Sequence, residues 1–128
     1  EKDVNLMSLP TLSSQACIYV KETLTPEKFG VIGYSENDIS GIIEKPSKPY
    51  PSNKAVTGIY FFPSDVFDKI KSLDYSKRGE LEVTDLNNLY IKEKKMWCIE
   101  MTEDEFWSDC GSFETLLSTS NYIKNSEE

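Results

Sequence analysis

The chain has 128 residues, of which 22 are acidic and 14 are basic, so its formal net charge at pH 7 is −8. This length fits one ordinary domain, and 38% hydrophobic residues with 12% aromatics exceed what a disordered chain contains. The acidic balance argues against a nucleic-acid partner, because a phosphate backbone needs a basic surface. No apolar run approaches the ~20 residues that span a bilayer, so we expect a globular protein without a membrane partner.

Histidine is absent, which excludes Ser-His-Asp and Cys-His catalysis and imidazole-ligated zinc. The three cysteines, Cys17, Cys98 and Cys110, have no C-x-x-C spacing and indicate neither a disulfide scaffold nor a zinc ribbon. A reducing cytoplasm is the expected location, and no secretory signal opens the chain. Because the first residue is Glu1 and not Met, we expect an excerpt or a processed product.

The first half of the chain predicts a lead-in segment over residues 1–14 followed by three short strands. Apolar runs indicate strands at 16–20, 30–34 and 39–43. The last two are joined by a polar turn at 36–38, which is typical of a β-hairpin.

A proline-rich loop follows the hairpin, and a long apolar run then predicts a strand over 55–62 that is buried on both faces. Ser64 is the expected N-cap of a helix. The apolar residues of this helix recur at helical spacing and are Val66, Phe67, Ile70 and Leu73.

The second half predicts a helix capped by Thr84, a strand over 96–101, an acidic turn at 102–105 and a last helix capped by Ser112. Strands that alternate with helices indicate the α/β class. We therefore expect a mixed sheet with a β-hairpin and flanking helices.

Two clusters of charged residues lie at the end of an expected strand and before an expected helix. Glu44 and Lys45 end a strand before Pro46, where a carboxylate and an ammonium could bind a hydroxyl and a phosphate; the alternative is an ordinary charged strand end. Arg78 precedes a helix N-terminus and could bind an anion, or it could neutralise the nearby acidic residues, which are Glu80, Glu82 and Asp85.

Two further segments could line a ligand site. Asp109, between Trp107 and the expected cap Ser112, could be a ligand of a hard metal such as Mg²⁺, or simply a turn aspartate. Gly58 lies inside a strand, which often marks the close approach of a ligand or of another backbone, with core packing as the alternative. The six glycines are scattered, so no glycine-rich loop is present to bind a triphosphate.

In their order and spacing these motifs resemble the sugar nucleotidyltransferases, most closely the glucose-1-phosphate thymidylyltransferases. The matching segments are Pro26 to Val31, Glu44 to Pro46, Ser52-Asn53, Ala55 to Tyr60, Arg78 to Asp85 and Trp107 to Ser112. The resemblance implies a Rossmann-like fold of which residues 15–128 would form only the second, sugar-phosphate-binding half. Its first half, with the triphosphate loop, the base-reading residues and a first metal-binding aspartate, has no counterpart in this sequence.

Residue by residue, the resemblance implies that Glu44 binds sugar hydroxyls, and that Lys45 and Arg78 bind the sugar phosphate. Gly30 would offer its backbone amide, and Asp109 would be one of two aspartates that bind Mg²⁺. The pocket for the sugar would be lined by the strand residues Val56, Gly58 and Tyr60. Sugar preference stays open, because Lys28 and Gly33 stand where many members have Arg and Glu.

The implied reaction is nucleotidyl transfer from a nucleoside triphosphate, with dTTP expected, to a sugar 1-phosphate, with glucose 1-phosphate expected. This chain would be inactive alone, and a half-fold would form a homo-oligomer or associate with the missing half. The competing reading is a non-catalytic module that binds a sugar phosphate or mediates an interaction.

Overall fold

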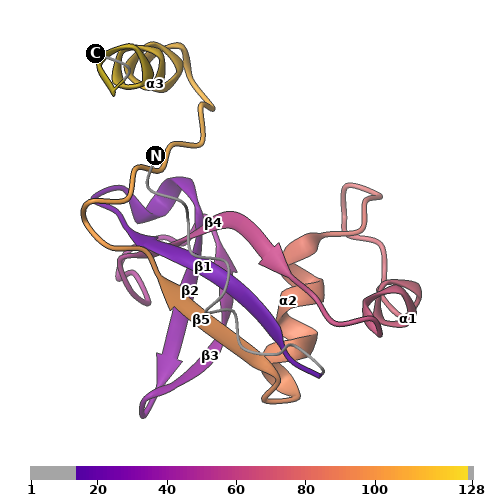
Figure 1. Ribbon diagram of the computed structural model, residues 1–128. Helices are drawn as coiled ribbons and strands as arrows, with labels where there is room; N and C mark the ends of the chain where they lie inside the picture. The colour runs from indigo at the N-terminus through magenta and orange to yellow at the C-terminus, as the bar shows by residue number, and fades with distance from the viewer. Residues whose placement is uncertain (1–13, 127–128) are drawn as a thin grey trace.

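The computed structural model describes residues 14–126, so the expected lead-in segment lies almost entirely outside the described residues. Figure 1 shows mainly strands in the first half of the chain and mainly helices in the second half. The elements are β1 (Ala16–Glu22), the 3-10 helix η2 (Pro26–Lys28), β2 (Gly30–Ser35), β3 (Asp38–Glu44), β4 (Lys54–Phe61), α1 (Val66–Lys71), α2 (Val83–Lys92), β5 (Met96–Glu100) and α3 (Phe113–Ser126). The expected order of elements is confirmed.

The five strands form one mixed sheet in the order β3-β2-β4-β1-β5. Strand β1 runs antiparallel to β4 and parallel to β5, and β2 runs antiparallel to both β3 and β4. The prediction of a mixed α/β sheet is therefore confirmed.

The β2–β3 hairpin is also confirmed, but its turn is tighter than expected. Its loop is Glu36-Asn37, and Asp38 already pairs with Ser35 as the first residue of β3. Glu36 has a φ of 59°, the left-handed conformation that tight two-residue hairpin loops favour.

The core lies where α2 covers the sheet. One buried cluster joins β1, β2, β3 and α2 through Ile18, Val20, Ile32, Ile42 and Ile91. A second cluster joins the start of β1 to α2 through Ala16, Leu86 and Tyr90. These apolar residues place α2 firmly against the strand β3 that ends at Glu44.

Strand β4 is not buried on both faces, so that expectation is wrong. Ala55 is fully buried, but Ile59 is 42% exposed. The second part of this strand borders an open pocket, which is lined by Gly58 and Tyr60, and Gly58 has a φ of 87°.

Two of the three expected helix caps are also wrong. Helix α1 has Asp65 and not Ser64 at its N-cap, and α2 has Glu82 and not Thr84 at that position. Neither Asp65 nor Glu82 makes a side-chain cap hydrogen bond to its helix, and the Asp65 carboxylate binds a distant residue instead. Tyr90 donates its hydroxyl to Asp65 Oδ1 over 2.7 Å.

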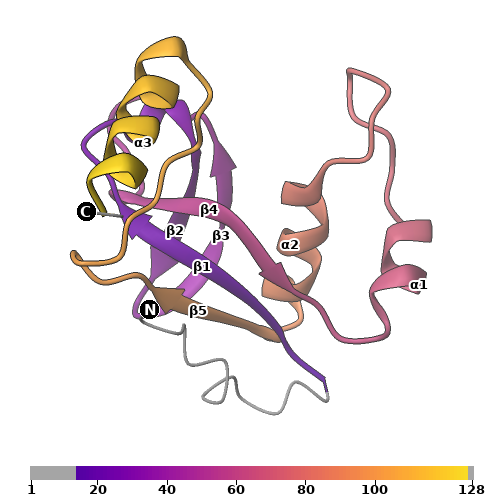
Figure 2. The ribbon, with the colours of Figure 1, turned by 45° about the horizontal axis from the view of Figure 1, so that its top comes forward.

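The cap of α3 agrees with the sequence. Ser112 Oγ accepts a hydrogen bond from the amide of Thr115 over 3.1 Å. Figures 1 and 2 show α3 following a long connection after β5. Its side chains are not buried, and among the described residues no helix is long and apolar enough to cross a membrane.

Candidate functional site

A pocket of about 280 Å³ opens beside the ends of β3 and β4. Five parts of the chain contribute to it, which are the segment before β2, strands β3 and β4, helix α2 and the connection after β5. The residues that line it are Lys28, Phe29, Gly30, Ile42, Glu44, Val56, Thr57, Gly58, Tyr60, Val83, Thr84, Asn87, Trp107 and Asp109. The fold therefore brings together six residues expected at the site, Gly30, Glu44, Val56, Gly58, Tyr60 and Asp109.

Glu44 is positioned by the hairpin and by α2. It is the last residue of β3, where its backbone pairs with Gly30 at the start of β2. Thr84 donates its hydroxyl to Glu44 Oε2 over 3.4 Å. A Cβ atom on Gly30 would lie only 2.9 Å from the same oxygen, so the glycine allows the carboxylate its place on the pocket wall.

Tyr60 provides a hydroxyl that stays protonated at neutral pH. Burial raises the pKa of Tyr60, and the charge of the nearby Glu44 carboxylate adds to this effect. The phenol is therefore available as a neutral hydrogen-bond donor beside a carboxylate acceptor, and Val56 on the same strand supplies apolar surface.

Asp109 is held at the pocket by its neighbours in the connection after β5. Trp107 donates its indole N–H to the carbonyl oxygen of Thr57 over 3.0 Å, and its ring centroid lies 5.1 Å from that of Phe29. Asp109 Oδ1 accepts a hydrogen bond from the amide of Gly111 over 3.2 Å.

Lys45 and Arg78 are the two expected site residues that are not among those lining the pocket. Lys45 follows β3 with its amide bound to the carbonyl oxygen of Phe29 over 2.9 Å, and its side chain is exposed. Its φ of 45° is unusual for a residue other than glycine.

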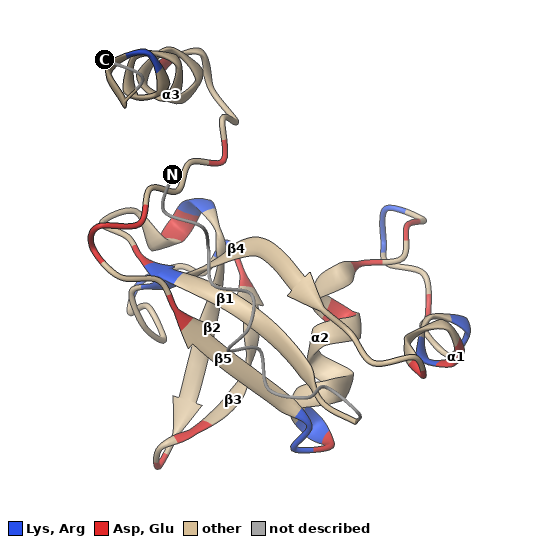
Figure 3. Ribbon diagram, viewed as in Figure 1, with Lys and Arg blue, Asp and Glu red and all other residues tan. Residues whose placement is uncertain are grey.

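Arg78 is bound to the carboxylates that follow it in the loop between α1 and α2. Its Nη2 atom lies 2.9 Å from Glu82 Oε1 and 3.5 Å from Glu80 Oε2. The hydrogen bond with Glu82 and the charges of both glutamates raise the pKa of the guanidinium. Figure 3 shows basic and acidic segments side by side in this loop.

Lys28, Thr84 and Asn87 line the pocket but were not among the binding residues expected from the sequence, where Lys28 entered only as a position related to sugar preference. Lys28 brings an ammonium group to the pocket, whereas Thr84 was expected only as a helix cap. Asn87 is 1% exposed and belongs to the buried face of α2, one turn after Thr84. A polar residue among the buried positions Leu86 and Tyr90 was the signal that could have identified it.

Of the two carboxylates that line the pocket, Glu44 and Asp109, only Asp109 was expected from the sequence to bind a hard metal. Asp109 is exposed, and residues 14–126 contain no group of three or more His, Cys, Asp or Glu side chains placed to hold a metal ion. A single carboxylate fits Mg²⁺, which binds proteins through one or two carboxylates and completes its shell with water and substrate phosphates.

The chain belongs to the nucleotidyl transferase family, whose sequence model matches residues 10–126. A glucose-1-phosphate thymidylyltransferase from Neisseria meningitidis is 34% identical over 110 residues, which cover 85% of this chain and 38% of that protein. A bifunctional sugar-1-phosphate nucleotidylyltransferase/acetyltransferase from Sulfurisphaera tokodaii is 39% identical over 112 residues, which cover 87% of this chain and 26% of that protein.

Solved structures of the same family share the fold. A Bacillus anthracis crystal structure described as a glucose-1-phosphate thymidylyltransferase is 40% identical, with a TM-score of 0.74 over 84% of this chain and 43% of that one. An apo-UDP-glucose pyrophosphorylase is 27% identical, with a TM-score of 0.75 over 89% of this chain and 44% of that one. The chain spans about two fifths of the length of the curated thymidylyltransferases that it matches.

Proposed function

We propose that this chain is the sugar-phosphate-binding second half of a sugar-1-phosphate nucleotidyltransferase, with glucose 1-phosphate as acceptor and dTTP as nucleotide donor. The observation that carries the proposal is the meeting of Gly30, Glu44, Tyr60 and Asp109 at one pocket, although Gly30 and Asp109 belong to distant parts of the chain. These residues are ones that the sequence resemblance assigns to the sugar and to the metal.

The pocket suits a sugar ring by its chemistry. The Glu44 carboxylate accepts hydrogen bonds from two ring hydroxyls, and the protonated Tyr60 hydroxyl donates to another oxygen. Val56 gives the ring an apolar surface, and Gly58 leaves the backbone open to a close approach. Burying a ring between such groups fixes the position of its 1-phosphate.

Lys45 and Arg78 bind the sugar phosphate in this proposal, with Lys28 as a further cation at the pocket. The exposed Arg78 side chain exchanges its carboxylate partner, Glu82, for the phosphate. The exchange is feasible because exposed ion pairs contribute at most about 1 kcal/mol. An arginine can bind a phosphate through two parallel hydrogen bonds.

In the proposed reaction a phosphate oxygen of the sugar 1-phosphate attacks the α-phosphorus of the triphosphate. A new P–O bond forms, the bond to the β-phosphate breaks, and pyrophosphate leaves. Asp109 would hold Mg²⁺, which offsets the negative charge of the phosphates when bound. The cations of this chain orient the attacking phosphate oxygen and lower the repulsion between the two substrates.

The competing proposal is a non-catalytic module that binds a sugar phosphate. It is favoured by one observation, namely that the six glycines of these 128 residues are scattered and form no triphosphate-binding loop. Both proposals require a partner for the half-fold, either a second copy or the remaining part of the domain, because exposed strand edges such as β5 offer unpaired backbone groups.

Pyrophosphate release with glucose 1-phosphate, dTTP and Mg²⁺ separates the two proposals. The full-length protein that carries this chain should release pyrophosphate and form a nucleoside diphosphate sugar, whereas residues 1–128 alone should not. Turnover above about 1 s⁻¹ by residues 1–128 alone would show that no second half is needed. Binding of glucose 1-phosphate by a full-length protein without turnover would favour the non-catalytic module.

A further inference from the structure

Two consecutive asparagines of α2 have side chains with opposite hydrogen-bonding states. Asn88 Oδ1 accepts a hydrogen bond from the amide of Ile42 over 2.8 Å, and Asn88 Nδ2 donates to the carbonyl oxygen of Ile42 over 3.1 Å. Both polar groups of Asn88 are therefore used to bind α2 to β3. Its role is structural.

Asn87 is more deeply buried, and yet its amide oxygen has no such partner. The residue is 1% exposed, and Oδ1 is enclosed without a hydrogen-bond partner among residues 14–126. A buried polar atom without a partner is costly, and native structures contain few of them. Asn87 also lines the pocket, so a bound ligand is in a position to supply the missing donor.

The surroundings of Asn87 indicate the kind of donor. Thr84, one helical turn earlier, lines the same pocket and directs its hydroxyl toward Glu44. Ile42 and Val56 add apolar surface. The uncharged amide oxygen of Asn87 can accept a hydrogen bond from a hydroxyl group of a neutral ring. A phosphate oxygen cannot take this role, because it carries no proton to donate at neutral pH.

We infer that Asn87 accepts a hydrogen bond from one hydroxyl group of the sugar and is a specificity-determining residue of the pocket. The inference rests on the proposed function, because it takes the occupant of the pocket to be a sugar 1-phosphate. A sugar that lacks this hydroxyl leaves Asn87 Oδ1 buried and unpaired. Sites built to bind a substrate hydroxyl reject analogues without it far more strongly than apolar pockets reject a missing methylene.

The experiment compares Asn87→Ala with Asn88→Ala in the full-length protein. Calorimetry measures the Kd of α-D-glucose 1-phosphate and of its monodeoxy analogues, and a thermal melt measures stability. Asn87→Ala should raise the Kd of glucose 1-phosphate about tenfold with an unchanged Tm, because Oδ1 has no hydrogen-bond partner within the described part of the chain. Asn88→Ala should instead lower the Tm, because two hydrogen bonds to Ile42 are lost.

The analogue series gives a signature that a structural role would not produce. The wild type should bind one monodeoxy analogue about tenfold more weakly than glucose 1-phosphate, and Asn87→Ala should bind the two equally. If Asn87→Ala does not fold, Asn87→Ser offers a smaller change at the same place, with the same expected loss of discrimination.

Four results would overturn the inference. In the first, Asn87→Ala binds every sugar phosphate with the same Kd as the wild type. In the second, Asn87→Ala lowers the Tm as much as Asn88→Ala does. The third is a wild type that does not bind glucose 1-phosphate at all, which would overturn the proposed function as well. A wild type that binds the sugar phosphate together with a variant that discriminates equally well would overturn the role of Asn87 alone.

Discussion

The indole N–H of Trp107 donates to the carbonyl oxygen of Thr57 over 3.0 Å and joins two segments that lie 50 positions apart. Thr57 is itself fixed, because its hydroxyl donates to the carbonyl oxygen of Tyr19 over 2.8 Å. The connection that carries Asp109 is therefore bound to β4, the central strand of the sheet, and through Thr57 to the neighbouring strand β1. The hydrogen bond between Trp107 and Thr57 therefore positions the exposed Asp109 carboxylate at the pocket.

Trp107→Phe tests whether the hydrogen bond from Trp107 to Thr57 positions Asp109. Phenylalanine keeps an aromatic ring for the contact with Phe29 but loses the indole donor, so the free energy of unfolding should fall by about 1 kcal/mol. In the full-length protein the Mg²⁺ concentration that gives half-maximal pyrophosphate release should rise, because Asp109 is less well positioned. Chemical denaturation and a magnesium titration measure the two effects.

Trp97→Phe is the matched control for this prediction. Trp97 is 51% exposed on β5, so its replacement should change the free energy of unfolding by no more than about 0.5 kcal/mol. Equal effects of the two substitutions on stability and on magnesium dependence would show that the bond to Thr57 does not position Asp109.

Local patterns in the sequence were sufficient for the elements and insufficient for their ends. Two short apolar runs and the polar turn between them predicted the hairpin, which begins at Gly30 and ends at Glu44. The cap at Ser112 was predictable because its partner Thr115 lies three residues away. Tyr90 binds Asp65 from 25 positions away, and no local pattern contains that information.

The same distinction applies to the candidate site. Glu44 and Asp109 were identified because they lie in recognisable motifs, and the fold then places them at one pocket. Asn87 was missed because its importance comes from what surrounds it in space. The burial of β4 was overestimated because an apolar run does not reveal that Tyr60 and Gly58 border a pocket.

Arg78→Ala tests whether the guanidinium binds the sugar phosphate or only neutralises its neighbours. In the full-length protein the KM for glucose 1-phosphate should rise at least tenfold, since one charge-assisted contact to phosphate is lost. The free energy of unfolding should change by less than about 1 kcal/mol, because the ion pair with Glu82 is exposed. Steady-state kinetics and chemical denaturation give the two values.

Two companion variants separate the interpretations of Arg78. Glu82→Gln weakens the competing ion pair, so the KM should stay the same or fall. Lys77→Ala removes an exposed neighbouring charge and should leave the KM nearly unchanged. If Lys77→Ala and Arg78→Ala raise the KM equally, a general loss of positive charge explains the effect and Arg78 is not a phosphate ligand.

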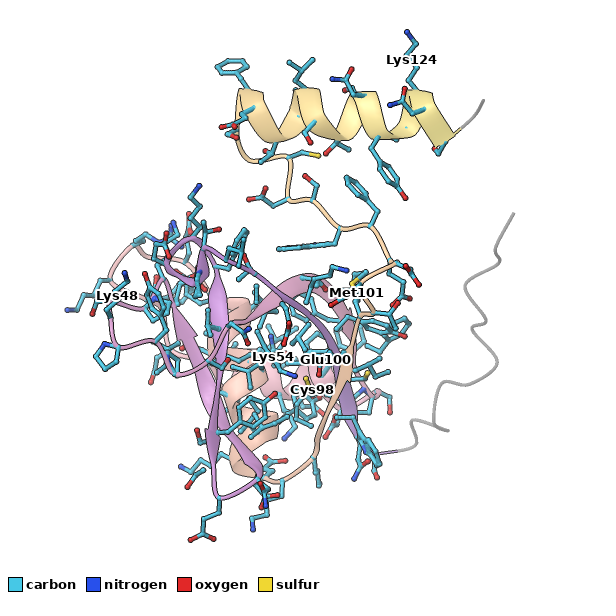
Figure 4. The ribbon with its side chains drawn as sticks, turned by 90° about the vertical axis from the view of Figure 1, so that its left-hand side faces the viewer. Lys48, Lys54, Cys98, Glu100, Met101 and Lys124 are labelled. Atoms are coloured by element: carbon cyan, nitrogen blue, oxygen red, sulfur yellow. The ribbon has the colours of Figure 1, made fainter. Side chains whose placement is uncertain are left out.

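Alkaline pH should destabilise the fold through Cys98. Burial raises the pKa of the Cys98 thiol from 9.0 to about 11, and the charge of Glu100 adds to the effect while Lys54 opposes it. Figure 4 shows Lys54, Cys98 and Glu100 close together. Between pH 9 and 11 the unfolded chain releases this proton while the folded chain keeps it, so the free energy of unfolding falls as the pH rises.

Cys98→Ser removes this thiol, so the loss of stability between pH 9 and 11 should become smaller. Denaturant midpoints measured at intervals across this range provide the comparison. Cys110→Ser, at an exposed cysteine, is the control and should retain the wild-type slope. Identical slopes in all three proteins would mean that Cys98 does not contribute to the alkaline loss of stability.

Gly30→Ala tests whether the exact position of the Glu44 carboxylate matters for the sugar. The new Cβ would lie 2.9 Å from Glu44 Oε2 and 3.3 Å from Ile42 Cγ2, so the flexible glutamate must move. Because displacing a binding group by about 1 Å can cost up to about 100-fold in rate, kcat/KM for glucose 1-phosphate should fall between about tenfold and 100-fold.

Gly33→Ala on the same strand is the control: its Cβ would meet Ser40 Oγ at 3.0 Å, and Gly33 is not among the residues that line the pocket. Gly33→Ala should therefore retain its kcat/KM, and an equal loss in both variants would show that disturbance of β2 itself, and not displacement of Glu44, lowers the activity.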